Sequence, residues 1–452
     1  MPSADAPRGG VVFAFRALRH RNYRLFFTGQ LISLIGTWIT RLATGWLVYK
    51  LTESAFLLGV VSFAGLIPTF LLTPLGGVLA DRRSRHGILL VTQACLMAIS
   101  FTLAWCAIQG VIDVPHLIVL CTLQGVCNAF DIPARQAFVV DMVEDRADLS
   151  SAIALNSMIF NGARLLGPSV AGVLVALFGE GLCFLIDGFS FLGVLAALLA
   201  MRVPPRTPRE KPTHVLHDLG EGFRASFGFA PIRSLMLLLA LTSLVGMPYI
   251  VLMPIFADRI LGGDAILLGF LMAATGIGAL IGAWYLALRR SVLGLGRVIA
   301  ACGIAFGVVL ILFGVSRIVW ISLVILIVAG FAMMVQNAAS NTIVQTLVDD
   351  NKRGRVMSFF AMAFMGTMPF GSLLAGTLAK HIGAPLTVIL GGNICLLGSL
   401  VFLLRLPRLK PLVRPIYVAR GIMPPIPEGV GSTAGLVSPN GDSRGAQAGE
   451  TQ

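Results

Sequence analysis

The segment NAFDIPARQAFVVDMVEDRADL, residues 128–149, recurs in degraded form as NAASNTIVQTLVDDNKRGRV at residues 337–356. Two further pairs repeat at a similar distance: SAFLLGVV at 54–61 with DAILLGFL at 264–271, and GPSVAGVLVALFG at 167–179 with GSLLAGTLAKHIG at 371–383. The spacing of roughly 204 to 210 residues far exceeds the roughly 20 to 50 residues of a solenoid repeat. The sequence therefore predicts a protein made of two related halves.

Each half is strongly apolar, which indicates a membrane protein. Only 12% of the 452 residues are charged and 56% are hydrophobic, whereas soluble domains have about a quarter charged residues. Apolar runs of about 20 residues can cross a bilayer core, and twelve such runs are centred near Leu34, Ile67, Ile99, Gln124, Leu165, Leu192, Leu244, Gly276, Gly307, Ala329, Ala363 and Leu396. We expect an all-α integral membrane fold of twelve transmembrane helices in two pseudo-symmetric six-helix bundles, a parallel repeat found in transporters.

The net charge of +13 follows the membrane topology and argues against a nucleic-acid partner. Basic residues cluster in alternate loops, at Arg16, Arg19, Arg21, Arg24, Arg82, Arg83, Arg85, Arg202, Arg206, Arg209, Lys211, Arg289, Arg290, Arg297, Lys352, Arg353, Arg355, Arg405, Arg408 and Lys410. The opposite loops hold only Lys50, Arg259, Arg317 and Lys380. Because positive loops stay in the cytoplasm, we expect a bacterial cytoplasmic (inner) membrane protein with both termini cytoplasmic.

The same pattern divides the chain into segments. We expect a cytoplasmic arm at 1–24, bundles at 25–201 and 232–405, a linker at 202–231, and a Pro/Gly/Ser-rich disordered tail at 406–452. The seven cysteines all fall in apolar spans without CxxC spacing, so we interpret them as small apolar fillers. We expect no removed signal peptide, no cofactor or metal site, and a monomer in the bilayer whose partners are protons and a small molecule.

Several spans carry polar residues at helical spacing, and a polar helix face cannot lie against lipid. These candidates for a shared substrate cavity are Gln30, Thr37, Arg41, Gln124, Asn128, Asn161, Gln336, Asn337 and Asn341. The alternative is that such side chains only join helices by hydrogen bonds across their interfaces. A lining in which Arg41 and Arg164 lie beside Phe160 and Trp38 favours an anionic or aromatic substrate.

Ionisable residues inside spans are costly, so each one suggests a function. Asp131 and Arg135 have the order and spacing of a helical ion pair, and we consider Asp131 either a proton carrier or half of a static pair. Asp187 and Arg164 are further proton-coupling candidates, and Arg164 is a potential partner for Asp187. The second half lacks these charges, because Ser340 and Val344 align with Asp131 and Arg135.

The short loop GVLADRRSRH, residues 77–86, joins the second and third spans. We expect Gly77 to permit close helix approach, and Asp81 with Arg82 and Arg85 to latch one conformation. The loop resembles the G-x-L-A-D-R-x-G-R-K signature of the major facilitator superfamily, from which Ser84 and His86 depart.

The fifth span resembles a second superfamily element. Gly167, Pro168 and Gly172 resemble the G-P-x-x-G-G element of proton-coupled exporters, with Ala171 in place of one glycine. Pro168 weakens a helix, so these residues are hinge candidates, and simple helix packing is the alternative. A further departure is Cys121, which stands where many proton-coupled members have arginine.

The strings WLVYKLTESAFLLGVV, DIPARQAFVVDMV and CFLIDGFSFL are similar to the superfamily branch that contains the enterobactin exporter. This resemblance implies a secondary active transporter that exports a siderophore or drug-like amphiphile against protons by alternating access. An uptake symporter and a non-transporting membrane protein are the alternatives. The histidines lie in loops or at span ends without a metal-spaced cluster, so we expect no enzyme.

Overall fold

The computed structural model of the protein describes residues 15–143, 145, 148–202, 223–289 and 291–424. Within these ranges all regular structure is helical, and twelve helices are long and apolar enough to cross a membrane. The predicted all-α membrane fold with twelve spans is therefore confirmed.

The first half contains η1 (Arg16–Arg19), α2 (Arg21–Thr52), α3 (Ala55–Arg82), α4 (Arg85–Ile108), α5 (Val114–Met142), α6 (Leu149–Phe178) and α7 (Glu180–Ala200). The second half contains α9 (Ala230–Leu241), η3 (Thr242–Gly246), α10 (Tyr249–Ile255), η4 (Phe256–Ile260), α11 (Ala265–Leu288), α12 (Leu295–Val315), α13 (Val319–Leu347), α14 (Asp350–Ala361), η5 (Met362–Gly366), α15 (Met368–Ile382) and α16 (Ala384–Ala419). In this half η3, η4 and η5 are π-helical turns.

The sequence repeat is visible in how equivalent helices begin and end. The Ser54 side chain accepts a hydrogen bond from the Leu57 amide at the start of α3, and Asp264 caps α11 in the same way. Gly179 and Gly383 follow α6 and α15 with φ of 80° and 84°, a conformation that glycine adopts without strain. The repeated residues therefore set the same helix boundaries in both halves.

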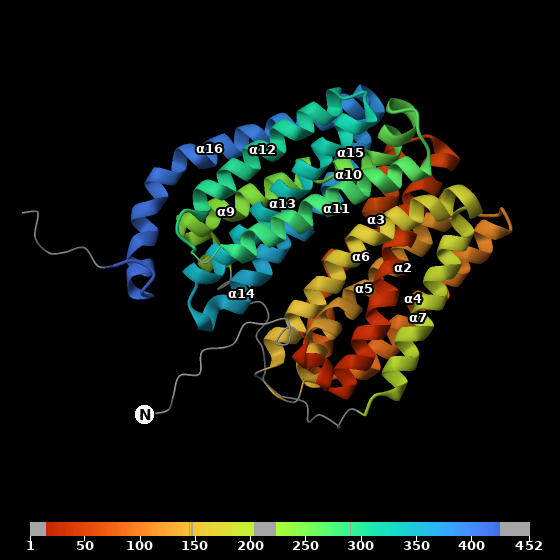
Figure 1. The fold of residues 1–452 in the computed structure, drawn as a ribbon, viewed down its shortest axis with the longest axis horizontal. Helices are drawn as coiled ribbons and strands as arrows, with labels where there is room; N and C mark the ends of the chain where they lie inside the picture. Colours follow the sequence, from red (N-terminus) through yellow and green to blue (C-terminus); the bar gives the residue numbers. More distant parts are fainter. Residues whose placement is uncertain (1–14, 144, 146–147, 203–222, 290, 425–452) are drawn as a thin grey trace, which may run out of the picture.

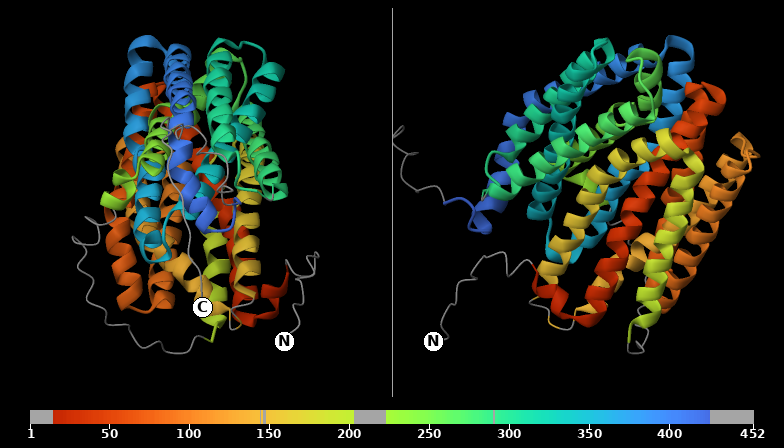
Figure 2. Two further views of the ribbon diagram at one scale, coloured as in Figure 1. Left: turned by 90° about the vertical axis from the view of Figure 1, so that its left-hand side faces the viewer. Right: turned by 45° about the vertical axis from the view of Figure 1, so that its right-hand side comes forward.

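The two bundles meet at one side of the molecule and diverge toward the other (Figures 1 and 2). We call the side where α3 ends and α4 begins, at Arg82–Arg85, the basic side, and the side where α2 ends and α3 begins the opposite side. α3 packs against α15 and α6 packs against α11, and these four helices form most of the contact between the halves, to which α10 adds smaller contacts with α2 and α3.

The buried apolar side chains describe the same shape. One core cluster joins the halves: it includes Leu47 and Leu58 of the first half together with Phe256 and Leu268 of the second. Toward the basic side each half has its own cluster, one within residues 17–201 and one within residues 232–409. Because apolar packing holds the halves together only where a core is shared, the structure is closed on the opposite side and open toward the basic side.

Two glycine pairs allow the close contact between the halves. A Cβ on Gly59 would lie 2.6 Å from the Ser372 carbonyl oxygen, and a Cβ on Gly376 would lie 2.7 Å from that of Ala55. In the second contact, a Cβ on Gly172 would lie 2.6 Å from the Ala265 carbonyl oxygen. Larger residues at these positions would force the helices apart.

Helices run past three of the boundaries predicted from sequence. α2 begins at Arg21 instead of residue 25, and residues 223–228 of the linker are helical. α16 continues through Ala419, so the tail predicted as disordered from residue 406 is helical over its first part; residues 425–452 and 203–222 lie outside the described ranges. This extension stays helical despite its prolines because Leu409, Val413 and Ile416 pack on the second-half core. The helix bends in this region (Figure 1).

Candidate functional site

Asp131 of α5 lies at the centre of a buried polar network in the first half. Its side chain is 1% exposed, and its Oδ1 accepts hydrogen bonds from Thr92 Oγ1 at 3.0 Å and Gln93 Nε2 at 2.8 Å. Arg135 Nη2 lies 3.0 Å from Asp131 Oδ2, and Arg135 Nη1 donates to Gln30 Oε1 at 2.9 Å. The predicted Asp131–Arg135 pair therefore exists and links α2, α4 and α5.

Asp187 of α7 is fully buried without a cation. Ser100 Oγ of α4 donates to Asp187 Oδ2 at 2.8 Å, while Oδ1 lies against Gly36 of α2 and has no hydrogen-bond partner in the described structure. Among the described residues no basic group comes within 4.0 Å of Asp187, so Arg164 is not its partner as the sequence had suggested. This carboxyl group is supported by hydroxyl groups alone.

One helix, α4, supplies uncharged partners to both acids, and sequence reasoning missed them. Thr92, Gln93 and Ser100 of α4 are all buried, and their spacing places Thr92 and Gln93 about two turns from Ser100 on the same side of the helix. The available signal was a run of polar residues in the third span. It was overlooked because none of the three side chains is ionisable.

Arg41 and Arg164 form a second group of charges on α2 and α6. The Arg41 guanidinium carbon lies 4.9 Å from the centre of the Trp38 ring, and Trp38 meets Phe160 edge to face with ring centres 6.1 Å apart. Arg41 and Arg164 therefore lie beside this ring contact on two helices that pack against each other. Arg41 is exposed and Arg164 half-buried, each in the middle of its helix.

The other predicted cavity residues divide into two groups. The half-buried ones are Thr37, Gln124, Asn128, Asn161, Asn337 and Asn341. Gln30 and Gln336 are each only 2% exposed, and Gln336 Nε2 donates to Thr242 Oγ1 at 3.3 Å. For these two glutamines the prediction of a cavity lining is wrong in this conformation, because each joins helices of its own half.

The loop on the basic side is held together through Arg85. Its Nη1 donates to the Ala137 carbonyl oxygen at 2.9 Å and lies 3.0 Å from Asp141 Oδ2, which ties α4 to the end of α5. Asp81 is 3.5 Å from Arg85 and largely exposed, and Arg82 is exposed beside it. These contacts all lie within the first half.

The close helix approach expected at Gly77 is wrong for this conformation. A Cβ on Gly77 would meet nothing within 4 Å, whereas a Cβ on Gly76 would collide with the Ala129 carbonyl oxygen. The sequence motif identified the correct turn of α3, and the helix phase places the neighbouring glycine at the contact.

The three hinge candidates are packing points in a continuous helix. α6 runs from Leu149 to Phe178 through Pro168. A Cβ on Gly167 would collide with Trp38 of α2, and Gly172 packs against the second half at Gly269. The packing explanation is therefore present in the structure, and bending at Pro168 stays a prediction.

Polar contacts on the opposite side join the two halves. The Tyr49 hydroxyl donates to Asp258 Oδ2 at 2.6 Å, and Arg259 pairs with Glu53. Sequence reasoning did not single out these residues, because each lies at a span end where charges are ordinary. They add charge-assisted bonds to the closed side.

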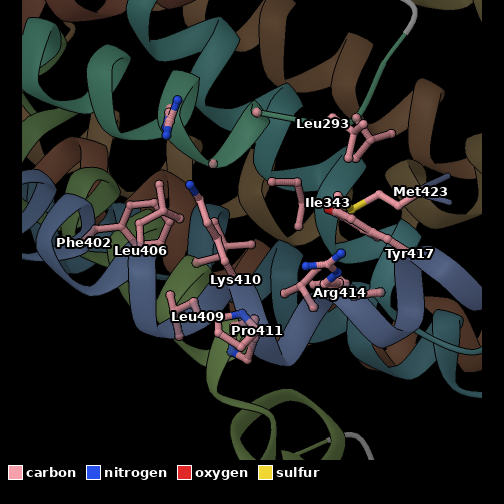
Figure 3. A pocket seen from close by; sticks show the side chains of 18 residues that line it. Leu293, Ile343, Phe402, Leu406, Leu409, Lys410, Pro411, Arg414, Tyr417 and Met423 are labelled. Carbon is pink, nitrogen blue, oxygen red and sulfur yellow. The ribbon is translucent and has the colours of Figure 1, made fainter. Parts of the chain in front are cut away.

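A separate cavity of about 550 Å³ lies entirely within the second half (Figure 3). It is lined by α9, the segment 292–294, α12, α13 and the extension of α16, with Leu293, Ile343 and Phe402 among its lining residues. Lys410 and Arg414 of α16 reach its edge (Figure 3). All lining residues come from one half, so this cavity does not lie between the bundles. No cluster of metal-ligating side chains occurs in the described ranges.

The family of the chain follows from comparison with known proteins. A family model described as a transmembrane secretion effector, one of the major facilitator families, matches residues 12–416. The protein belongs to this family. Its members are membrane transporters, so the chain is a transporter and not an enzyme.

Other members of the superfamily resemble the chain over most of its length. The staphyloferrin A transporter of Staphylococcus aureus is 27% identical, and the alignment covers 86% of this chain and 97% of that protein. The multidrug efflux pump Tap of Mycolicibacterium fortuitum is 26% identical, covering 83% of this chain and 93% of its own length. The macrolide efflux protein A of Streptococcus pyogenes is 22% identical, and the alignment covers 85% of this chain and 96% of that protein.

Two solved structures with the same fold are a POT family transporter and a bacterial homologue of a lysosomal transporter. A POT family transporter in complex with 5-aminolevulinic acid has a TM-score of 0.69 at 12% identity, covering 86% of this chain and 96% of its own. A bacterial homologue of the human lysosomal transporter Spinster, in an inward-facing and occupied conformation, has a TM-score of 0.67 at 16% identity. The superposition covers 85% of this chain and 96% of that chain. These similarities support the major facilitator fold.

Proposed function

We propose that this protein is a proton-coupled exporter of a small organic molecule in a bacterial cytoplasmic membrane, working by alternating access. The proposal draws its direction from the family relatives, which are named as a siderophore transporter and as drug efflux proteins. A siderophore or a drug-like amphiphile is accordingly the expected substrate.

The observation that carries the proposal is the arrangement of the apolar cores. A single core joins the halves on the opposite side, while two separate cores lie toward the basic side. Positive loops favour the cytoplasm, so the basic side and both termini are assigned to the cytoplasm. This conformation then admits substrate from inside the cell, and rocking of one half against the other would release it outside.

The buried acids support coupling to protons. A carboxylate removed from water is costly unless a cation or a proton neutralises it. Asp131 has Arg135 at 3.0 Å, whereas within the described residues Asp187 has the Ser100 hydroxyl and no cation as a partner. Binding and release of a proton at either acid would alter the contacts of α4 with α5 or α7.

Transport in everted membrane vesicles tests the proposal. The substrate is first found by comparing small molecules in spent medium from a deletion strain and its parent. Vesicles acidified inside by respiration should then accumulate that compound, and nigericin, which removes the pH gradient, should abolish the accumulation. Accumulation that persists in the presence of nigericin would exclude proton coupling. Uptake only into right-side-out vesicles would favour the symporter.

A further inference from the structure

We propose that Arg41 and Arg164 form a subsite for the anionic group of the transported molecule, with Trp38 and Phe160 contacting an adjoining aromatic or apolar part. The inference rests on the proposed transport function and adds a substrate class to it. The favoured ligand is a carboxylate next to an aromatic ring.

The first argument is the missing counter-charge. Neither guanidinium group of this pair has an ion pair or a hydrogen bond with any residue in the described part of the chain, although both lie deep within membrane helices. Arg135 provides the contrast, because it pairs with Asp131 and donates to Gln30. A membrane-embedded arginine needs a partner or water. An incoming anion would supply the counter-charge that the described residues do not provide.

The second argument is the geometry of the charges. Arg41 and Arg164 lie on the packed helices α2 and α6, beside two aromatic rings that meet, and like charges held on neighbouring helices repel each other. A carboxylate between them would receive charge-assisted hydrogen bonds from both, and the guanidinium fork matches its planar shape. The empty pair is therefore arranged for an anion rather than for a neutral or cationic group.

The third argument is the aromatic surface beside the charges. Phe160 and Arg164 are four residues apart on α6, and Trp38 and Arg41 are three apart on α2, so each pair shares a helix face. Phe160 is 49% exposed, and its ring edge meets Trp38. An aromatic part of the ligand can contact these rings while its acid group reaches the arginines.

The second half also contributes a polar group. Tyr249 of α10 is buried, and its hydroxyl lacks a hydrogen-bond partner in the described structure. α10 packs against α2, which carries Arg41, and against α11, which carries Thr275 and packs against α6. Thr275 donates its own hydroxyl hydrogen to the Met272 carbonyl oxygen. The Tyr249 hydroxyl is thus free to donate to an anion held by Arg164, which would link the two halves through the ligand.

The test measures binding of named probes to the purified full chain in phosphatidylcholine nanodiscs by isothermal titration calorimetry. We expect 2-naphthoate to bind at least tenfold more tightly than the neutral 2-naphthamide and than inorganic phosphate. Arg41→Gln and Arg164→Gln should each weaken naphthoate binding roughly 10- to 100-fold, and Tyr249→Phe about 3- to 10-fold. Arg24→Gln, which removes an exposed charge from the same α2 helix, is the matched control and should bind normally.

Thermal unfolding of the same samples separates binding from folding. Because each glutamine variant relieves a like-charge pair, its unfolding temperature should stay equal to that of the wild type or rise. Equal binding of naphthoate and naphthamide, or normal naphthoate binding by both arginine variants, would overturn the subsite. If phosphate binds as tightly as naphthoate and the arginine variants lose both, the anion site stands and the aromatic contact is rejected.

The outcome is independent of proton coupling. Naphthoate binding that depends on both arginines, combined with no pH-driven flux of any compound, would leave the subsite and reject the exporter. Intact proton-driven export of a cationic or neutral compound, without naphthoate binding, would leave the exporter and reject the subsite.

Discussion

The buried acids Asp131 and Asp187 differ in what supports them. Asp131 has a cation, a hydroxyl and an amide as partners, whereas Asp187 has the Ser100 hydroxyl. Removing the charge therefore has different consequences at the two positions, because only the first leaves a cation behind.

At Asp131 the substitution Asp131→Asn should abolish proton-driven flux and leave the protein folded. The amide can still accept from Thr92 and Gln93, and Arg135 keeps Gln30 and is partly exposed to water. Flux in acid-interior vesicles and the melting temperature in detergent measure the two effects. Asp113→Asn, a change at an exposed N-cap, is the control; undiminished pH-driven transport by Asp131→Asn would remove Asp131 as the carrier.

The substitution Asp187→Asn leaves no buried cation without its counter-charge, so the free energy of unfolding should change by less than about 1 kcal/mol. If Asp187 carries the proton, the same variant should still exchange substrate across the membrane but lose the dependence on the pH gradient. Counterflow of labelled substrate, measured with and without nigericin, checks this. Normal gradient-driven accumulation would assign Asp187 a purely structural role.

The sequence revealed the membrane charges of the site but only one of their partners. Arg41, Asp131, Arg164 and Asp187 are visible as charges in apolar runs, and the Asp131–Arg135 pair follows from spacing on one helix. The contacts of Asp187 with Ser100 and of Asp131 with Gln93 join different helices. Such contacts depend on helix packing and rotation, which hydropathy does not encode.

At the scale of elements, long apolar runs predict where helices lie but not how far they extend. All twelve expected spans exist, because a span needs only length and hydropathy. The last bundle was expected to end at residue 405, yet α16 continues through Pro407, Pro411 and Pro415. Their spacing of four puts them on one helix face, so the lost hydrogen bonds bend the helix without ending it.

Removal of the α16 extension should destabilise the second half. Leu409 is buried in its core, and Arg420 Nη2 donates to the Val348 carbonyl oxygen at 2.8 Å, just after α13. A chain ending at Arg405 should therefore melt at a clearly lower temperature than the full chain. A chain ending at Pro424 is the matched control, and equal melting temperatures for the two truncations would show that the extension adds no stability.

The whole molecule is held in its present conformation by close contacts on the opposite side. Gly59→Val and Gly172→Val would each place atoms where a carbonyl oxygen of the other half lies. Overpacking of this kind costs about 1–3 kcal/mol, which corresponds to roughly a 5- to 150-fold shift of an equilibrium. Both variants should therefore favour opening of the opposite side.

Hydrogen–deuterium exchange of the full chain checks that shift. The first turns of α3 and α11, on the opposite side, should exchange faster in the two valine variants, while the basic-side end of α3 should exchange more slowly. Gly193→Val, where a Cβ meets nothing within 4 Å, should leave the pattern unchanged. Unaltered exchange in Gly59→Val would contradict the role of these glycines in closure.

The glycine contacts have a further consequence when they are compared through the repeat. Gly59 and Gly269 occupy one repeat position, and Gly172 and Gly376 occupy another. Gly59 meets Gly376, and Gly172 meets Gly269, so the first position contacts the second in both directions. This reciprocity defines an isologous interface, as in a twofold symmetric dimer. A six-helix unit with one glycine at each position would make both contacts on pairing with a copy of itself, so duplication of such a unit accounts for the whole interface at once.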